Sequence, residues 1–468
     1  MSLVKLKPTS QITVPPFDKI GYGFYNFKPF EHQLTTILFL LRNKRAYVFN
    51  GLGSGKTASA IWAYDILRYT NKVKRMLVIA PLSILETVWL EEVRNIAPHL
   101  RPTIMHGPKE SRLQALKSNA NIVITNHDCV RTYWEEIIQT NFDIIVIDEL
   151  TAFKHNSSRS RAMRRISKAV KSVWGMTGTP ITTGAMDAYG LGLAVNPSKL
   201  PTPYMTKFRN MVMYQIDMYN YEHKEGWETV VHNALQPAIR FKTEECIDLP
   251  PITFETRIVN MPKETEEAYN NMVKEQLHEL KTGTITAVNA GVKFSKLLQI
   301  AGGTAIDEEG NIHSLPCNSK LNELISVIQE SGNKLIVFCQ FVAQITLIER
   351  YLKDKKYNVS SISGKVPVSQ RAKIFKDFQH ADTEVLIAQV STASHGVTLT
   401  SASYILYWTP VMGVEKYVQS IGRVRRAGQS ENQHIIKLIS CKIEKELYRK
   451  LDSGTLTNED ILDMYTNL

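Results

Sequence analysis

Residues 46–57, Ala-Tyr-Val-Phe-Asn-Gly-Leu-Gly-Ser-Gly-Lys-Thr, decide the fold. The four leading residues predict a strand, the glycine-rich stretch predicts a loop, and Ala58–Arg68 predicts a helix. Gly51, Gly53 and Gly55 allow the backbone to curl until several N–H groups point at one anion, and the helix N-terminus adds partial positive charge. The alternative is a glycine turn that binds nothing, but the order strand, loop, helix favours a phosphate-binding loop.

Two side chains at the end of this loop suit a nucleoside triphosphate. Lys56 is expected to reach the β- and γ-phosphates, and the Thr57 hydroxyl is expected to bind Mg²⁺. The backbone of Gly53-Ser54-Gly55 would form the cradle around the phosphates. The long form of this motif begins with Gly, where this chain has Asn50, whereas the shorter form Gly-x-Gly-Lys-Thr is complete. The sequence therefore predicts that ATP and Mg²⁺ bind here.

A second apolar run, Ile144–Ile147, is followed by two carboxylates. Ligands of parallel α/β sheets collect at the carboxyl ends of the strands, so Asp148 and Glu149 are expected to face the phosphate loop. Asp148 would hold Mg²⁺ through water, and Glu149 would polarise the attacking water as general base. An Asp-Glu pair after a strand is common, but its presence in one α/β region with Lys56 favours a site that hydrolyses ATP.

Two regions, about 30–195 and 317–440, alternate apolar runs with helical patterns, which is typical of parallel α/β sheets. The expected strands of the first region are Ala46–Phe49, Met76–Ala80, Ile122–Thr125, Ile144–Ile147 and Val173–Thr177. Those of the second region are Leu335–Cys339, Val359–Ile362, Val385–Ala388, Tyr404–Tyr407 and His434–Leu438. The predicted fold class is therefore α/β, with two parallel sheets flanked by helices.

Leu249-Pro250-Pro251 interrupts the stretch between these regions and marks the expected boundary between two lobes. The first lobe is expected over residues 1–248, with a helical insertion at about 198–248. The second is expected over 249–468, with a helical insertion at about 261–316 that includes a helix over Lys263–Leu280.

Composition restricts the class of protein and of partner. The 468 residues include 56 Lys and Arg against 45 Asp and Glu, a formal net charge of +11 that favours polyanions such as nucleic acid without proving one. The five cysteines lack zinc-type spacing, so we expect reduced thiols and no structural zinc. Because residues 1–16 lack the apolar core of a signal peptide and no apolar run suits a membrane span, we expect an intracellular, cytoplasmic protein, in the host cytoplasm if it is viral. We also expect the protein to be a monomer.

Further motifs stand in a fixed order along the chain. In the first lobe they are Lys28–Gln33, then Val78–Ser83 followed by Trp89 and Glu92, and then Met176–Pro180. Near and after the lobe boundary they are Arg240, Lys242, Leu249-Pro250, Leu297–Ile300, Ser319–Leu321, Leu335–Gln340, Ser391–Thr400, Trp408–Pro410 and Gln419–Gln429. With the phosphate loop and the Asp-Glu pair, this series resembles helicase superfamily 2, and specifically the Swi/Snf-type DNA translocases, over roughly the whole chain.

The resemblance implies two tandem RecA-like lobes and further site residues. Gln33 would read adenine, and Thr177 and Thr179 would couple ATP to movement. Residues 414–426 predict a helix that places Gln419, Arg423 and Arg426 on one face, with the two arginines as fingers on the γ-phosphate rather than as a solvated basic face.

Two positions depart from the family pattern after the carboxylate pair. The family usually carries a small residue and then His, where this chain has Leu150 and Thr151. That His would couple the ATP site to the third motif, so a Thr leaves the coupling without its usual group. The middle of Trp408-Thr409-Pro410 also differs, because the family carries Asn there. Because 468 residues leave no room for the accessory reader domains of larger family members, we expect a motor without them.

Nucleic-acid contacts are expected in loops at the edges of the two sheets, mainly with the backbone. The expected contact residues are Pro81, Ser83, Asn126, Gln340, Ser391, Thr392 and Trp408. Helix caps, satisfied polar loops and a core tryptophan remain the alternatives. Tyr214, Tyr219 and Tyr221 could form an exposed aromatic surface, although helical packing is favoured.

Three functions remain open at the level of sequence. The favoured one is a DNA-dependent ATPase that translocates on double-stranded DNA without necessarily separating the strands. The second is a strand-separating or branch-migration helicase of the same superfamily, for which the sequence has no obvious wedge segment, although helices near residues 205–235 could hide one. The third is a non-catalytic DNA clamp, which Asn50 and Thr151 would permit.

Overall fold

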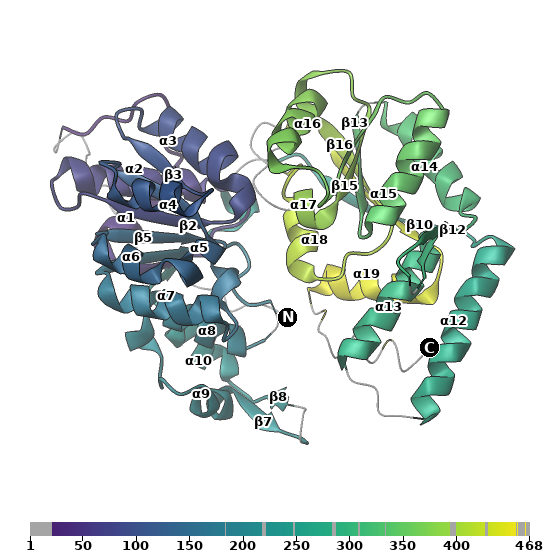
Figure 1. Ribbon diagram of the computed structural model, residues 1–468, viewed down its shortest axis with the longest axis horizontal. Coiled ribbons are helices and arrows are strands. Elements are labelled where there is room, and N and C mark those ends of the chain that lie inside the picture. The colour runs from purple at the N-terminus through teal and green to yellow at the C-terminus, as the bar shows by residue number, and fades with distance from the viewer. Residues whose placement is uncertain are drawn as a thin grey trace. The chain divides into compact units, whose positions relative to one another are not determined.

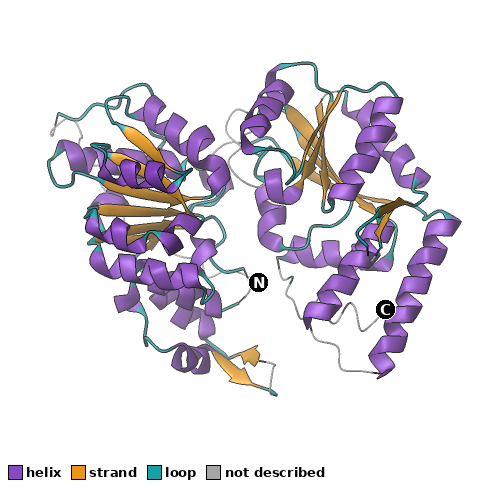
Figure 2. Ribbon diagram, viewed as in Figure 1, coloured by secondary structure: helices purple, strands orange, loops and turns teal. Residues whose placement is uncertain are grey.

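The chain divides into two compact units, Met1–Asp248 and Leu249–Leu468. The computed structural model describes residues 21–182, 184–217, 221–246, 249–282, 287–307, 309–332, 334–393, 399–425, 429–454, 456 and 464. Each unit holds one parallel sheet with helices on both faces (Figure 1 and Figure 2). No helix within these residues is long and apolar enough to cross a membrane.

The sheet of the first unit has seven strands in the order β3-β4-β2-β5-β6-β1-β9, and all neighbours are parallel. The strands are β1 (Arg45–Val48), β2 (Met76–Ala80), β3 (Pro102–Met105), β4 (Ile122–Asn126), β5 (Ile144–Asp148), β6 (Ser172–Met176) and β9 (Ala238–Ile239). The helices are α1 (Glu31–Arg42), α2 (Lys56–Tyr69), α3 (Glu91–Ile96), α4 (Lys109–Lys117), α5 (His127–Thr132), α6 (Trp134–Gln139), α7 (Ser158–Ala169), α8 (Met186–Val195), α9 (Met205–Val212), α10 (Trp227–Ala234) and α11 (Thr243–Cys246).

Both faces of this sheet are buried, which explains the uninterrupted apolar runs of its strands. Along β2, Leu77 and Ile79 join a cluster with side chains of α4 to α8, whereas Met76 and Val78 join a cluster with side chains of α1, α2 and α3. Each fully buried aliphatic side chain contributes about 1.5–3 kcal/mol relative to an exposed one. The sheet is therefore a rigid support for the loops at its carboxyl edge.

The sheet of the second unit has six parallel strands in the order β10-β17-β16-β13-β15-β14. The strands are β10 (Ile252–Ile258), β13 (Lys334–Cys339), β14 (Val359–Ile362), β15 (Val385–Gln389), β16 (Ala402–Tyr407) and β17 (Gln433–Ile439). The helices are α12 (Lys263–Thr282), α13 (Ala287–Ala301), α14 (Asn318–Ser331), α15 (Val342–Asp354), α16 (Val368–His380), α17 (Val390–Ala393), α18 (Val414–Ile421) and α19 (Lys442–Ser453).

The α/β class with two tandem parallel-sheet lobes is confirmed, and all ten predicted strands are present within two residues at each end. The insertions are not purely helical. The first includes the antiparallel hairpin β7 (Met213–Gln215) and β8 (Tyr221–His223), and the second includes the hairpin β11 (Thr304–Ile306) and β12 (Ile312–Ser314). Tyr214 lies on the first hairpin and is 46% exposed, so the prediction that it packs in a helix is wrong. Tyr219 lies outside the described residues.

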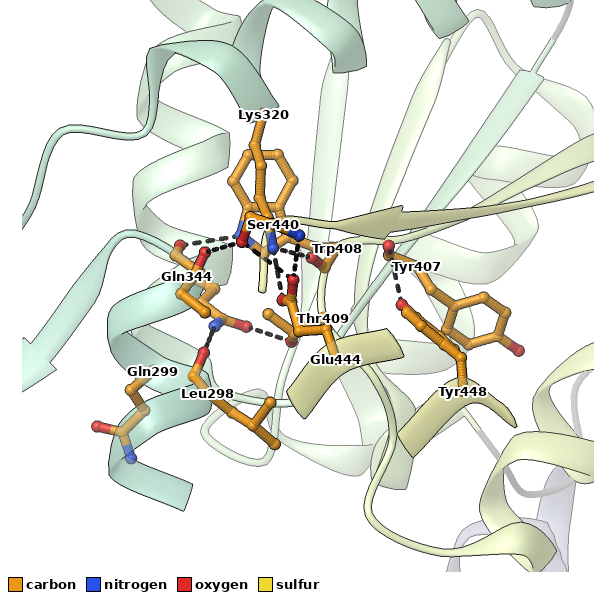
Figure 3. A network of polar contacts seen from close by, with 12 residues as sticks. Leu298, Gln299, Lys320, Gln344, Tyr407, Trp408, Thr409, Ser440, Glu444 and Tyr448 are labelled. Carbon is orange, nitrogen blue, oxygen red and sulfur yellow. Dashed lines mark hydrogen bonds and ion pairs between the residues drawn. The ribbon is translucent and has the colours of Figure 1, made fainter. Parts of the chain in front are cut away.

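A buried ion pair joins the carboxyl edge of the second sheet to α14 and α19 (Figure 3). Lys320 Nζ donates to Glu444 Oε1 at 2.6 Å and to the carbonyl oxygen of Trp408 at 3.1 Å. Glu444 Oε2 in turn accepts from the backbone N–H of Ser440 at 2.6 Å. Both charged side chains are almost fully buried, so each depends on the other for the solvation that it loses.

Replacing Lys320 with Met is expected to lower the free energy of unfolding of the second unit by about 3–5 kcal/mol, because Glu444 would stay buried without its counter-charge. The midpoint of urea unfolding, followed by tryptophan fluorescence, measures the loss. Lys353→Met is the matched control, since its pair with Glu349 is largely exposed and contributes about 0.3–0.5 kcal/mol. Equal midpoints for the two variants would contradict the assignment.

Candidate active site

The carboxyl ends of the strands bring the predicted ATP-site residues of the first unit to one edge of its sheet. Val48 at the end of β1 and Asp148 at the end of β5 both pair with Met176 at the end of β6. Neighbouring strands lie about 4.8 Å apart, so the start of the glycine loop and the carboxylate pair are about 10 Å from each other. A triphosphate spans such a distance, which makes this edge the candidate active site.

The glycine loop lies between β1 and α2, in the order strand, loop, helix that the sequence predicted. Gly53 and Gly55 have φ angles of 75° and 72°, in the left-handed region, and α2 begins directly afterwards at Lys56. The side chains of His32 and Gln33 lie against the loop, where Nε2 of each reaches the carbonyl oxygen of Ser54 at 2.9 and 3.4 Å. Gln33 is therefore beside the loop, as its expected role requires, and His32 is an additional contact that the sequence did not single out.

Gly55→Ala is expected to weaken ATP binding by tenfold or more. An added Cβ would lie 1.9 Å from Nε2 of Gln33, and the left-handed backbone costs a residue with a side chain about 1–2 kcal/mol. Relaxing the clash would displace the loop or Gln33. Equilibrium binding of a fluorescent ATP analogue measures the change.

Gly23→Ala is the control for this prediction, because nothing lies within 4 Å of its added Cβ. Binding by Gly55→Ala that matches the Gly23→Ala control would show that the loop does not hold the nucleotide.

Asn50, which departs from the long form of the glycine motif, is completely buried and ties the loop to two other segments. Its Nδ2 donates to Thr36 Oγ1 of α1 at 2.9 Å, and its Oδ1 accepts from the backbone N–H of Phe241 at 3.1 Å. The backbone N–H of Gly51 also donates to the Phe241 carbonyl, and Thr243 Oγ1 donates to the Leu52 carbonyl. Asn50 therefore anchors the loop, and its side chain has a structural use that Gly could not provide.

The donor groups around the loop fit a phosphate and a hard divalent cation. Lys56 Nζ donates to the carbonyl oxygens of Asn50 and Gly51 at 2.9 and 3.0 Å, so the ammonium group lies across the loop. Thr57 stands in the first turn of α2, and Asp148 supplies a carboxylate at the same sheet edge. Hydroxyl and carboxylate oxygens are ligands that Mg²⁺ accepts.

The carboxylate pair is held by several hydrogen bonds. Asp148 Oδ2 accepts from Trp89 Nε1 at 2.9 Å, and Oδ1 accepts from the backbone N–H of Glu149 at 3.0 Å. Glu149 has a φ of 48° and a ψ of 59°, a left-handed conformation that is rare for a residue with a side chain and is often found at functional sites. The backbone carbonyl of Asp148 faces His127, whose Nε2 is 2.8 Å away. The sequence singled out Trp89 as part of a motif but did not predict its hydrogen bond to Asp148.

The third motif follows β6 at this edge. Thr177 is 1% exposed, its backbone N–H donates to the carbonyl of Val48 at 3.1 Å, and its Oγ1 accepts from the N–H of Thr179 at 3.3 Å. The motif is thus bonded to the strand that carries the phosphate loop, which is consistent with a coupling role.

The nucleic-acid candidates of the first unit lie at the ends of β2 and β4. Asn126 is the last residue of β4, and Pro81 directly follows the neighbouring strand β2. After Pro81 a helical stretch begins with a 3₁₀ turn at Leu82–Ile84 and a π-helix at Leu85–Leu90. Ser83 lies in that first turn. Asn126 Oδ1 is buried without a hydrogen-bond partner among the described residues.

The candidates of the second unit have different outcomes. Gln340, Ser391 and Thr392 follow β13 and β15, whose ends are paired, and all three side chains are at least partly exposed. Trp408 is completely buried, and its Nε1 donates to the Gly302 carbonyl at 2.9 Å. The predicted DNA contact of Trp408 is therefore wrong, and the alternative of a core tryptophan is correct. The neighbouring Thr409 donates to Gln344 Oε1 at 3.0 Å (Figure 3), which gives this departure from the family pattern a packing role.

The predicted helix over residues 414–426 is too long. α18 ends at Ile421, and Arg423 and Val424 make tighter hydrogen bonds to Ser420 and Ile421. Each residue of a 3₁₀-type turn rotates further about the helix axis than a residue of an α-helix. The four-residue spacing of Gln419 and Arg423 therefore does not put their side chains on one helix face. Gln419 and Arg423 are 2% and 3% exposed, and Arg426 lies outside the described residues.

Comparison with known proteins gives matches over most of the chain. A model of the SNF2-related domain matches residues 32–302, and a model of the helicase conserved C-terminal domain matches residues 319–428. An uncharacterized ATP-dependent helicase of Mycoplasma genitalium, MG018, is 25% identical over 83% of this chain and 37% of its own length. The putative ATP-dependent helicase/translocase YwqA of Bacillus subtilis is 23% identical over 98% of this chain and 50% of its own.

Two further comparisons differ in coverage. The putative protein p41 of the Acyrthosiphon pisum secondary endosymbiont phage 1 is 25% identical over 87% of this chain and 92% of its own length. Among solved structures, the Sulfolobus solfataricus SWI2/SNF2 ATPase core in complex with dsDNA covers 92% of this chain with 22% identity and a TM-score of 0.46. The chain thus spans about half, or less, of the two bacterial relatives and most of the phage protein.

Proposed function

Because the chain belongs to the SNF2-related family, a family of ATP hydrolases, we propose that it is a DNA-dependent ATPase that translocates along double-stranded DNA. The observation that carries the proposal is the glycine loop and the Asp148–Glu149 pair at one sheet edge, about 10 Å apart. The Bacillus relative is described as a putative helicase/translocase, which supports the second part of the proposal.

In this proposal the polar groups of the candidate active site in the first unit have different roles. The loop N–H groups and Lys56 bind the phosphates, and Gln33, beside Ser54, recognises adenine. Thr57 and Asp148 hold Mg²⁺, which neutralises the charge on the phosphates when it is bound. Glu149 Oε accepts a hydrogen bond from the attacking water and takes its proton as the water oxygen bonds to the γ-phosphorus. The bond between that phosphorus and the β–γ bridging oxygen breaks in the same reaction, and ADP leaves.

In the second unit, Arg423 and Arg426 supply the guanidinium groups that neutralise the charge of the γ-phosphate, with Gln419 beside them in sequence. Gln340, Ser391 and Thr392 of this unit, with Pro81, Ser83 and Asn126 of the first, hold the DNA backbone. Backbone contacts carry little sequence preference, which suits a motor that moves along DNA. Thr177 and Thr179 pass the state of the ATP site to these loops.

The experiment that tests the proposal compares polymers. ATP hydrolysis is measured with no polymer, with linear duplex DNA, with single-stranded DNA and with RNA, at one salt concentration. Duplex DNA is expected to give the largest stimulation, and displacement of a triplex-forming strand is expected to follow ATP addition. Equal rates with and without duplex DNA would refute the proposal.

A second candidate, strand separation, has one observation in its favour. The hairpin β7–β8 and the residue after β7 present Tyr214 and Ile216, which are 46% and 56% exposed, and such exposed side chains could be inserted between base pairs. Unwinding of a fluorescent forked duplex tests it, with Tyr214→Ser as the variant. Unwinding by the parent that Tyr214→Ser abolishes, with ATP hydrolysis retained, would favour the helicase over a translocase that leaves the strands paired.

A further inference from the structure

The peptide bond between Asp148 and Glu149 is fixed at both of its polar ends. Its N–H donates to Asp148 Oδ1 at 3.0 Å, and its carbonyl oxygen lies 2.8 Å from His127 Nε2. A carbonyl oxygen only accepts hydrogen bonds, so this nitrogen of His127 carries the proton and donates it. The orientation of this peptide plane is related to the Cα–Cβ bond of Glu149 by the φ angle of that residue. It therefore influences the direction in which the Glu149 side chain leaves the backbone.

His127 comes from a different part of the sheet than the residues that it contacts. It is the first residue of α5, after β4, and β2 lies between β4 and β5 in the sheet. The imidazole is 8% exposed and packs edge-on against Phe153 at 5.5 Å and 78°. Phe153 is itself fully buried in the turn that follows Glu149. The histidine therefore bridges the end of β5 and the turn after the carboxylate pair.

Glu149 needs such support because of its backbone. A left-handed conformation in a residue with a side chain persists only where its surroundings impose it. The two bonds to the preceding peptide and the packing of His127 on Phe153 belong to these surroundings, together with the hydrogen bond from the Ala152 N–H to the Glu149 carbonyl at 3.0 Å. At position 151, where the resembling family carries a histidine, this chain has a buried Thr. In this chain the imidazole that contacts the backbone of the carboxylate pair belongs instead to His127, at the start of α5 after β4.

We infer that His127 is a positioning residue for ATP hydrolysis, which holds the Asp148–Glu149 peptide so that the Glu149 carboxylate meets the attacking water. The inference rests on the proposed function, since it concerns the rate of that reaction. His127 does not touch the reacting atoms in this role. Misplacing a general base by about 1 Å can lower the rate by as much as 100-fold, so the contact bears directly on turnover.

The test compares variants that keep or remove the donor. His127→Phe keeps a ring against Phe153 but cannot donate, and His127→Asn has an amide too short to reach the carbonyl. His127→Gln places an amide N–H close to the position of Nε2. His106→Phe, at an exposed position of the same unit, is the matched control. For each purified variant, kcat and KM for ATP are measured with saturating duplex DNA, together with the thermal unfolding midpoint.

We expect kcat of His127→Phe and His127→Asn to fall at least tenfold while KM for ATP changes less than about threefold. His127→Gln is expected to keep kcat within about threefold of the parent. A kcat of His127→Phe within twofold of the parent would overturn the inference, as would a Gln variant that loses as much as the Phe variant. Absence of ATP turnover in the parent itself would instead overturn the proposed function.

Discussion

Glu149→Gln is expected to lower ATP turnover with duplex DNA by about 10²–10⁴-fold, the usual contribution of a general base. The amide has the same shape as the carboxylate but cannot take a proton from water at neutral pH. The left-handed backbone and the hydrogen bonds around Asp148 do not involve the replaced oxygen. Nucleotide binding should therefore persist, and only the chemical step should fail.

The measurement is steady-state phosphate release, accompanied by equilibrium binding of an ATP analogue. Glu110→Gln provides the matched control, because Glu110 is exposed on α4 and the substitution changes the net charge equally. Unchanged turnover by Glu149→Gln would remove the assignment of the base. Loss of turnover in this variant, but not in the control, would exclude the non-catalytic DNA clamp.

Arg423→Ala is expected to reduce kcat by about 10³–10⁵-fold, the range found for arginine fingers in phosphoryl transfer. Its planar guanidinium can offer two parallel donors to the γ-phosphate, and an ammonium group cannot reproduce that geometry. Arg423→Lys should therefore remain severely impaired despite its retained charge. Binding of ATP in the absence of DNA should change little, since the phosphate loop and Gln33 belong to the first unit.

Single-turnover hydrolysis with saturating duplex DNA separates this chemical defect from weakened DNA binding. Arg449→Ala is the control, because that arginine is exposed on α19 and forms only a surface pair with Glu446. Because Arg423 is nearly buried, thermal unfolding of each variant verifies that it is folded. A folded Arg423→Lys with the parental rate would contradict the proposed role.

The sequence predicted the parts of the fold that depend on local pattern. Strands buried on both faces appear as continuous apolar runs, so β2 was placed to the residue. Edge strands lack that signal: β3 begins with Pro102 and is only half buried, and β10 alternates apolar with polar residues. The end of α18 was missed because Gly422 and the tighter turn after Ile421 do not interrupt the polar spacing of the motif.

The same distinction holds for the candidate site. A glycine loop or a carboxylate pair is contiguous in sequence, so its residues could be identified before their positions were known. The contacts of Trp89 and His127 with Asp148 depend on which strands are neighbours in the sheet, which no local pattern specifies. Trp408 shows the opposite error, because a motif tryptophan after a strand suits a surface contact as well as a buried one, and only packing distinguishes them.

The anchoring of Asn50 and Gly51 on Phe241 has a mechanical consequence. Thr243 is bonded to the carbonyl of Leu52, so three successive residues of the glycine loop are fastened to residues 241–243, the short segment that follows β9. Any displacement of residues 241–243 therefore moves the backbone of the glycine loop, so strain in the segment after β9 changes the geometry of that loop.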